Sequence, residues 1–221
     1  MPADPKGTLF DLCGGHPALD LVNSLDNRFR ADGPNEMLNS YADMLRFLEE
    51  SGLLNRQHVR VLSKVGESEA AAHALQSAHE LREATAAVLY SSLDRKEARQ
   101  QDIGMLERHF LDAARHRELQ WGVAKRGSAP AGRTAFSDRP GLAWSWGRHE
   151  NEPDLPVWAL AESVSDILLS PDMASVRTCA ADTCRWLFLD TSKNHTRRWC
   201  NMKVCGNRMK ARRFQARRDQ T

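Results

Sequence analysis

The chain has 221 residues, of which 41% are hydrophobic and 27% charged, and its formal net charge is +2. This is the composition of a folded globular protein and not of a disordered one. The sequence has no run of 18 uncharged apolar residues and no basic start followed by an apolar stretch, which excludes a transmembrane helix and a secretory signal. A cytoplasmic location is therefore expected.

The first part of the chain is predicted to form a helical bundle. Pro17 suits the first turn of a helix, and apolar residues follow at helical spacing, namely Leu19, Val22, Leu25 and Phe29. Ser40, Asn55 and Ser68 stand where the N-cap residues of three further helices are expected, and residues 96–115 form a fifth amphipathic stretch.

The pattern changes after Glu118. Residues 119–123, 134–136 and 142–146 are short aromatic stretches separated by Gly and Pro, and they predict a small antiparallel β-meander. Asp154 is expected to cap one more helix, which Ser170 and Pro171 end. The predicted fold class is mainly α with a small antiparallel β-meander, in an N-terminal domain of residues 10–170.

Positive charge and cysteines both concentrate at the other end. Residues 171–221 hold 12 Lys/Arg and 4 Asp/Glu, a balance of +8, whereas the rest of the chain carries −6. This asymmetry indicates an anionic partner for the C-terminal segment. Four of the five cysteines lie within 27 residues there, as two close pairs: Cys179, Cys184, Cys200 and Cys205.

Two close cysteine pairs separated by a loop are typical of a structural zinc site. Thiolates favour zinc over magnesium or calcium, and four protein ligands leave no open coordination position, so one structural Zn2+ per chain is expected. Four free buried cysteines and an iron–sulfur cluster are the alternatives. His195 lies inside the loop and could replace one thiolate, but with four cysteines available we expect it at the surface or in contact with an anion.

Residues 174–221 are predicted to form a treble-clef-like zinc module, a short hairpin followed by a basic helix. Residues 186–189 are expected to form a strand with Trp199 as its cross-strand neighbour, and the basic helix follows Cys205. Basic residues on such a segment are candidates for contacts with phosphates or bases of a nucleic acid, and a solvated tail is the alternative. The candidates are Arg197, Arg198, Arg208, Lys210, Arg212, Arg213 and Arg217.

The module resembles a known family. The sequence Cys205-Gly206-Asn207-Arg208, preceded by Arg198-Trp199-Cys200 and by Trp186-x-Phe188-x-Asp190, is similar to the CGNR zinc-finger family over about residues 175–218. Residues 14–24 (Gly-Gly-His-Pro-Ala-Leu-Asp-Leu-Val-Asn-Ser) resemble the opening of the ABATE domain that precedes this finger. The resemblance implies that the four cysteines bind zinc and that the protein is a bacterial transcription regulator linked to stress.

The N-terminal domain offers a candidate ligand pocket. His16, Asp20 and Asn23 would share one side of a helix, where they either meet a small-molecule effector or form a capping and core hydrogen-bond network, the interpretation we favour. Cys13 and His16 alone are too few ligands for a second metal site.

The sequence contains no Ser-His-Asp order, phosphate-binding loop or metalloprotease helix. We therefore expect a zinc-containing, DNA-binding transcription regulator that is not an enzyme. A zinc-stabilised adaptor for protein or RNA is one alternative, and a small-molecule sensor or enzyme centred on the N-terminal domain is another.

Overall fold

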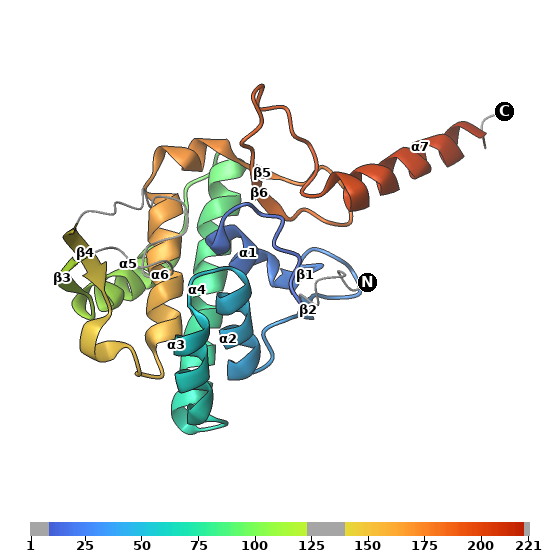
Figure 1. The fold of residues 1–221 in the computed structure, drawn as a ribbon. Coiled ribbons are helices and arrows are strands. Elements are labelled where there is room, and N and C mark those ends of the chain that lie inside the picture. The colour runs from blue at the N-terminus through green and yellow to red at the C-terminus, as the bar shows by residue number, and fades with distance from the viewer. Residues whose placement is uncertain (1–8, 123–139, 219–221) are drawn as a thin grey trace.

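The computed structural model describes residues 9–122 and 140–218, and the predicted stretch at residues 134–136 lies outside this part. Helices dominate the N-terminal body, and the long α4 runs through its middle (Figure 1). These helices are α1 (Pro17–Asn23), α2 (Tyr41–Glu50), α3 (Arg56–Leu62), α4 (Glu69–Leu93), α5 (Gln100–Arg115) and α6 (Leu155–Leu168). Short 3-10 turns lie at Ser63–Val65, Gly147–His149 (η2) and Pro171–Ser175 (η3).

The predicted N-caps of α2, α3 and α4 are confirmed. The Ser40 hydroxyl accepts a hydrogen bond from the backbone N–H of Asp43 at 3.1 Å, Asn55 caps α3, and Ser68 caps α4. Asp154 does stand before α6, but its side chain makes no capping hydrogen bond. The reason is its backbone, which is already helical at φ −85° and ψ −7°, whereas a capping residue is normally extended.

The first helix is shorter than its apolar spacing predicted. Helix α1 ends at Asn23, and the Ser24 hydroxyl donates to the carbonyl of Leu21 at 2.7 Å. The following residues Leu25–Asp26 (β1) pair with Asn35–Glu36 (β2) in an antiparallel bridge, so the prediction that the helix continues to Phe29 was wrong. A side-chain hydroxyl that bonds the last carbonyls competes with further helix, which explains the early end.

Two further hairpins lie later in the chain. Strands β3 (Glu118–Gly122) and β4 (Gly141–Ser145) pair antiparallel and are the outer stretches of the predicted meander. Strands β5 (Val176–Thr178) and β6 (Leu187–Leu189) also pair antiparallel, with Arg177 opposite Phe188. The strand expected near residues 186–189 is therefore present, but its cross-strand neighbour is β5 and not Trp199.

The hydrophobic core extends from the helical body into the C-terminal segment. Leu19, Leu81 and Leu160 are fully buried in the helices, and Val176 and Leu187 of the last hairpin belong to the same buried cluster. The β5–β6 hairpin is thus packed onto α1 as part of one core. Within the described residues, no helix combines the length and apolar character needed to cross a membrane.

Candidate metal centre and basic helix

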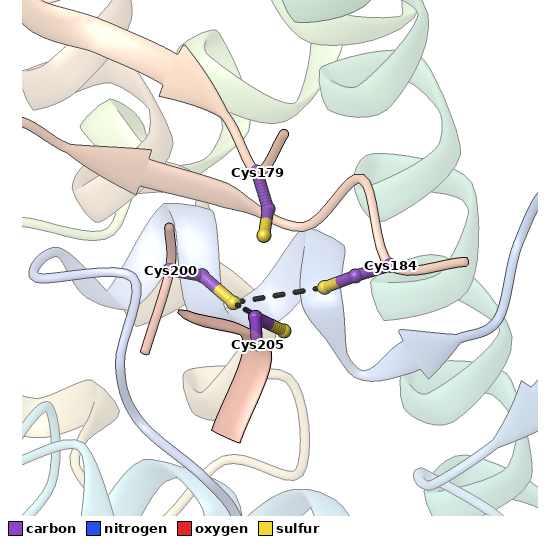
Figure 2. A group of neighbouring side chains, drawn as sticks. All are labelled: Cys179, Cys184, Cys200 and Cys205. Atoms are coloured by element: carbon purple, nitrogen blue, oxygen red, sulfur yellow. Dashed lines mark hydrogen bonds between the residues drawn. The ribbon is translucent and has the colours of Figure 1, made fainter. Parts of the chain in front are cut away.

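The four C-terminal cysteines converge from separate turns of the chain. Cys179 follows β5, Cys184 lies in the next turn, Cys200 follows the loop after β6, and Cys205 lies in the π-helical turn η4 (Met202–Gly206). Their sulfur atoms all lie within 4.8 Å of one another and point toward a common centre (Figure 2). Cys200 Sγ lies 3.6 Å from Cys184 Sγ and 3.7 Å from Cys205 Sγ.

These distances fit a tetrahedral zinc site. Four sulfur ligands at about 2.3 Å from zinc lie about 3.8 Å apart at the corners of a tetrahedron. The observed separations are close to this value and far longer than the roughly 2 Å of a disulfide, and all four cysteines are free thiols. An all-sulfur donor set favours zinc over oxygen-seeking cations. The four cysteines could therefore hold a zinc ion with no protein side chain needed beyond them.

Backbone hydrogen bonds shape the two turns that carry the ligands. The N–H of Cys179 donates to the carbonyl of Trp186 at 2.8 Å, and the N–H of Cys184 donates to Ala181 at 2.9 Å. In the second turn, the N–H of Cys205 donates to the carbonyl of Asn201 at 2.9 Å. Backbone hydrogen bonds within the chain thus hold each turn in shape and position its thiols.

Gly206 has a packing reason to follow the last cysteine. A Cβ atom there would lie 2.4 Å from Met202 Sδ and 3.2 Å from Trp199 Cδ1. The ring of Trp199 also packs against the cysteine cluster. A side chain at this position would therefore require Met202 to move and the Trp199 ring to shift slightly.

A basic helix starts directly after the last cysteine. Helix α7 (Asn207–Arg218) has six Lys/Arg and no Asp/Glu in twelve residues. It projects away from the rest of the protein (Figure 1). Met209 near its start packs against the cysteine cluster. The side chains of Arg208, Lys210 and Arg212 are exposed, whereas those of Arg213 and Arg217 lie outside the described part.

Comparison with protein families identifies both parts of the chain. The model of the ABATE family, whose description reads "Putative stress-induced transcription regulator", matches residues 15–171, which is more than half of the chain. The chain belongs to the ABATE family. A second model, described as the CGNR zinc finger, matches residues 175–218 and contains all four cysteines. No curated protein matches the chain.

The two matches and the geometry support a common conclusion. The CGNR match and the four-cysteine cluster support zinc binding, and the ABATE match supports a role in transcription regulation. Among the described residues the cluster consists of the four cysteines alone. His195 is exposed, and its Nδ1 atom donates to the carbonyl of Asp190 at 3.1 Å, so it has no place among the ligands.

The guanidinium of Arg197 in the CGNR finger contacts backbone carbonyls and an aromatic ring of the chain itself, which argues against the predicted phosphate contact. Its guanidinium donates to the carbonyls of Trp199 at 2.9 Å and Cys13 at 3.2 Å, contacts the carbonyl of Cys200, and lies over the ring of Phe188 at 4.5 Å. These contacts occupy the planar donor group from several sides. Its neighbour Arg198 is exposed, with its guanidinium 5.2 Å from the Trp199 ring, and remains a candidate for anion contact.

Asp190 organises the loop between the cysteine pairs. Its carboxylate accepts hydrogen bonds from the N–H and hydroxyl of Ser192 and from the N–H of Arg197. The hydrogen bond from the Ser192 hydroxyl, followed by the backbone donors, holds the pKa of the Asp190 carboxyl below its usual value. The Trp-x-Phe-x-Asp sequence pattern contained this residue, but its local role became visible only from the contacts.

His16, Asp20 and Asn23 of the ABATE domain are buried, and each makes a hydrogen bond within the chain, but the buried Nε2 atom of His16 makes none and lies 3.6 Å from the carboxylate of Asp166. His16 Nδ1 caps α1 at Ala18, Asp20 accepts from the N–H of Gly14 at 2.7 Å, and Asn23 bonds to Leu187. These bonds are those of a capping and core network, and the contact of the three residues with a small-molecule effector stays a prediction. Burial raises the pKa of Asp20 to about 7 against the opposing Gly14 hydrogen bond, and burial also lowers the pKa of His16.

The ABATE domain and the CGNR finger are joined by several hydrogen bonds that sequence analysis did not predict. The indole N–H of Trp186 donates to Asp26 at 2.8 Å, and the N–H of Leu189 donates to the carbonyl of Gly14 at 2.7 Å. The Tyr90 hydroxyl donates to the carbonyl of Arg185 at 3.0 Å. These partners are far apart in the sequence, so no local pattern could reveal them.

Proposed function

We propose that this protein is a cytoplasmic bacterial transcription regulator that binds DNA through α7 and the adjoining loop of its CGNR finger. In this proposal one structural Zn2+ per chain is held by Cys179, Cys184, Cys200 and Cys205. The observation that carries the proposal is that a helix with six basic and no acidic residues begins directly behind Cys205 and projects from the body (Figure 1).

The charge on α7 supports a polyanionic partner. Arg208 and Arg212 are four residues apart on the helix, where like charges oppose each other by about 0.2–0.5 kcal/mol. No acidic residue in the helix offsets them. A row of phosphates would offset this repulsion and release the counterions that the DNA had condensed, so binding would weaken steeply with salt.

The metal and the residues around it have a supporting role in this proposal. A bound zinc ion would supply folding free energy and keep the two cysteine turns together. Arg197, Asp190 and Trp199 would fix the loop that presents Arg198. The side chains that touch phosphate would then be Arg198, Arg208, Lys210 and Arg212, with Arg213 and Arg217 added from the sequence alone.

The ABATE domain would be the regulatory part. Its first helix is tied to the finger through Asn23, and the turn before that helix is tied through Gly14. A small-molecule effector that shifts α1 would therefore move the hairpin on which the cysteine turns are built. The same physical link supports regulation without any direct contact between the effector and DNA.

Fluorescence anisotropy of the full-length protein with labelled duplex DNA, titrated at several salt concentrations, tests the proposal. The variant replaces Arg208, Lys210 and Arg212 with alanine. We expect weaker binding and a shallower salt dependence, by about 0.9 in the slope of log K against log salt for each lost phosphate contact, or about 2.7 for three.

A matched control removes the same charge elsewhere. Arg56, Arg60 and Lys64 are exposed residues that follow one another at intervals of four along α3 and the turn after it. Their triple alanine variant should keep the wild-type slope. If both triple variants lose affinity equally, or neither does, α7 is not the DNA-binding element. Protein or RNA binding without selective duplex binding would favour the adaptor hypothesis.

A further inference from the structure

We propose that His116, His149 and Glu152 form a second metal site, for a divalent transition-metal ion, on the ABATE domain. His116 is the C-cap residue directly after α5, His149 is the last residue of η2, and Glu152 precedes α6. One ligand atom from each of the three lies within 4.8 Å of the other two, and all three residues are partly exposed. Apart from the four cysteines, this is the one such group among the described residues.

The site is separate from the cysteine cluster. It lies where α6 begins, whereas the hairpin of the finger follows the far end of α6 through η3. A helix of 14 residues spans about 21 Å at about 1.5 Å per residue. An ion bound here would therefore not share a ligand with the finger.

His116 is already oriented as a ligand. Its Nδ1 atom lies 2.8 Å from the backbone carbonyl of Asp112, and because a carbonyl only accepts, Nδ1 carries the hydrogen. The lone pair of Nε2 is therefore available. A hydrogen bond from the non-ligating nitrogen to a carbonyl is the usual way in which metal-binding histidines are held.

The ring of His116 is also held from its face. It stacks on Trp158 with ring centres 3.9 Å apart and planes at 11°. The indole N–H of Trp158 donates to the carboxylate of Asp112 at 2.7 Å, which keeps the indole in place. The His116 ring is therefore restrained before an ion binds, which lowers the entropic cost of binding.

His149 and Glu152 provide the other two ligands. His149 Nδ1 lies 2.5 Å from Glu152 Oε1, and its Nε2 accepts a hydrogen bond from Arg148 at 3.2 Å. The nitrogen that faces the carboxylate is thus Nδ1. A metal ion that binds both side chains would take the place of the proton between them, and this proton would leave to solvent.

The donor set indicates the class of ion. Two imidazoles and one carboxylate suit zinc, nickel, cobalt or iron, whereas magnesium and calcium prefer oxygen ligands alone. Three protein ligands leave coordination positions open to water or an anion, unlike the closed four-cysteine site. The ion would connect the end of α5 to the start of α6, and the inference does not depend on DNA binding.

Calorimetric titration of the zinc-loaded full-length protein with ZnCl2 or NiCl2 tests the site, after weakly bound metal has been removed by dialysis. We expect one saturable equivalent beyond the metal of the finger. His116→Ala and His149→Ala should each weaken it by about tenfold or more, and Glu152→Gln, which removes the charge but keeps the shape, should weaken it less. Circular dichroism of the zinc-loaded variants before titration checks that they are folded.

His73→Ala is the control, because His73 is an exposed histidine of α4 that lies near Asp154 but outside the cluster. The His73→Ala variant should bind the second equivalent of metal with an affinity within about twofold of wild type. The absence of a second equivalent would overturn the proposal and leave an ion pair beside an aromatic stack. An equivalent that persists unchanged in His116→Ala and Glu152→Gln would overturn it too, even if His149→Ala fails to fold.

Discussion

The side-chain amide of Asn23 pairs with both backbone groups of Leu187, 164 residues later in the chain. Its Nδ2 donates to the carbonyl at 2.9 Å, and its Oδ1 accepts from the N–H at 2.8 Å. Both residues are buried, so water cannot replace either bond. The amide thus bonds to β6 in the way that a neighbouring strand would. It joins the end of α1 to the hairpin of the finger.

Asn23→Ala should destabilise the whole protein and not just α1. The variant leaves the N–H and carbonyl of Leu187 buried without partners, at about 1–3 kcal/mol for each group. Urea unfolding followed by tryptophan fluorescence measures the loss. A free energy of unfolding within about 0.5 kcal/mol of wild type would contradict this role. Asn23→Asp is the companion variant, because aspartate can still accept from the N–H but cannot donate to the carbonyl.

Asp20 should make stability depend on pH in a defined direction. Burial raises its pKa to about 7 in the folded protein from 3.8, and Asp11 adds to the shift. A raised carboxyl pKa means that the folded state binds the proton more tightly. This contribution to stability is complete below the unfolded pKa and is lost as pH rises through the folded pKa.

Asp20→Asn removes this titration but keeps an oxygen that can accept from the N–H of Gly14. The stability of the variant relative to wild type should therefore rise between about pH 4 and pH 7, by up to about 1.4 kcal/mol per pH unit, and then level off. Unfolding free energies of both proteins across this range test the prediction. A difference that does not change with pH would show that Asp20 is ionised in the folded protein.

Arg197 and Arg198 should separate stability from DNA binding, although they are adjacent. Arg197→Ala removes the group that donates to four backbone carbonyls, and we expect a loss of about 2–3 kcal/mol with no change in salt slope for the folded protein. Arg198→Ala should leave the unfolding free energy unchanged and weaken duplex binding. If Arg197→Ala weakens duplex binding and Arg198→Ala lowers the unfolding free energy, Arg197 and not Arg198 lies at the interface. Arg197→Lys should rescue little, because an ammonium cannot reproduce the planar fork.

Zinc content should depend on four cysteines and not on the fifth. Cys205→Ser should lose most of its zinc and expose the cluster, whereas Cys13→Ser should keep one zinc per chain. Cys13 packs against the cluster without belonging to the group of four, which makes it the matched control. Metal analysis of both variants after dialysis gives the answer. Equal loss of zinc in both would mean that Cys13 is a ligand.

Much of the helical body could be predicted because its signals are local. Ser40, Asn55 and Ser68 cap their helices through backbone groups two or three residues away, so a short window of sequence contains the whole interaction. The cysteine spacing likewise contains most of the information for the metal site. Phe29 shows the limit, since apolar spacing alone cannot detect the Ser24 hydroxyl that ends α1.

The contacts that join the two parts could not be predicted because their partners are distant in sequence. Nothing near Asn23 indicates Leu187, and nothing near Trp186 indicates Asp26. A phosphate contact was predicted for Arg197 because the sequence shows its charge but not the carbonyl groups that it contacts. His149 and Glu152 meet within one local turn, but His116 joins them only when α5 and α6 pack side by side.

If the cysteine cluster holds a DNA-binding helix in place, the affinity for duplex DNA should change when zinc is removed. The full-length protein is titrated into labelled duplex DNA as purified, after treatment with a zinc chelator, and after zinc is added back. We expect affinity to fall by about tenfold or more when zinc is removed and to return with about one equivalent. A metal-free protein that binds the same duplex with unchanged affinity and salt dependence would contradict the claim.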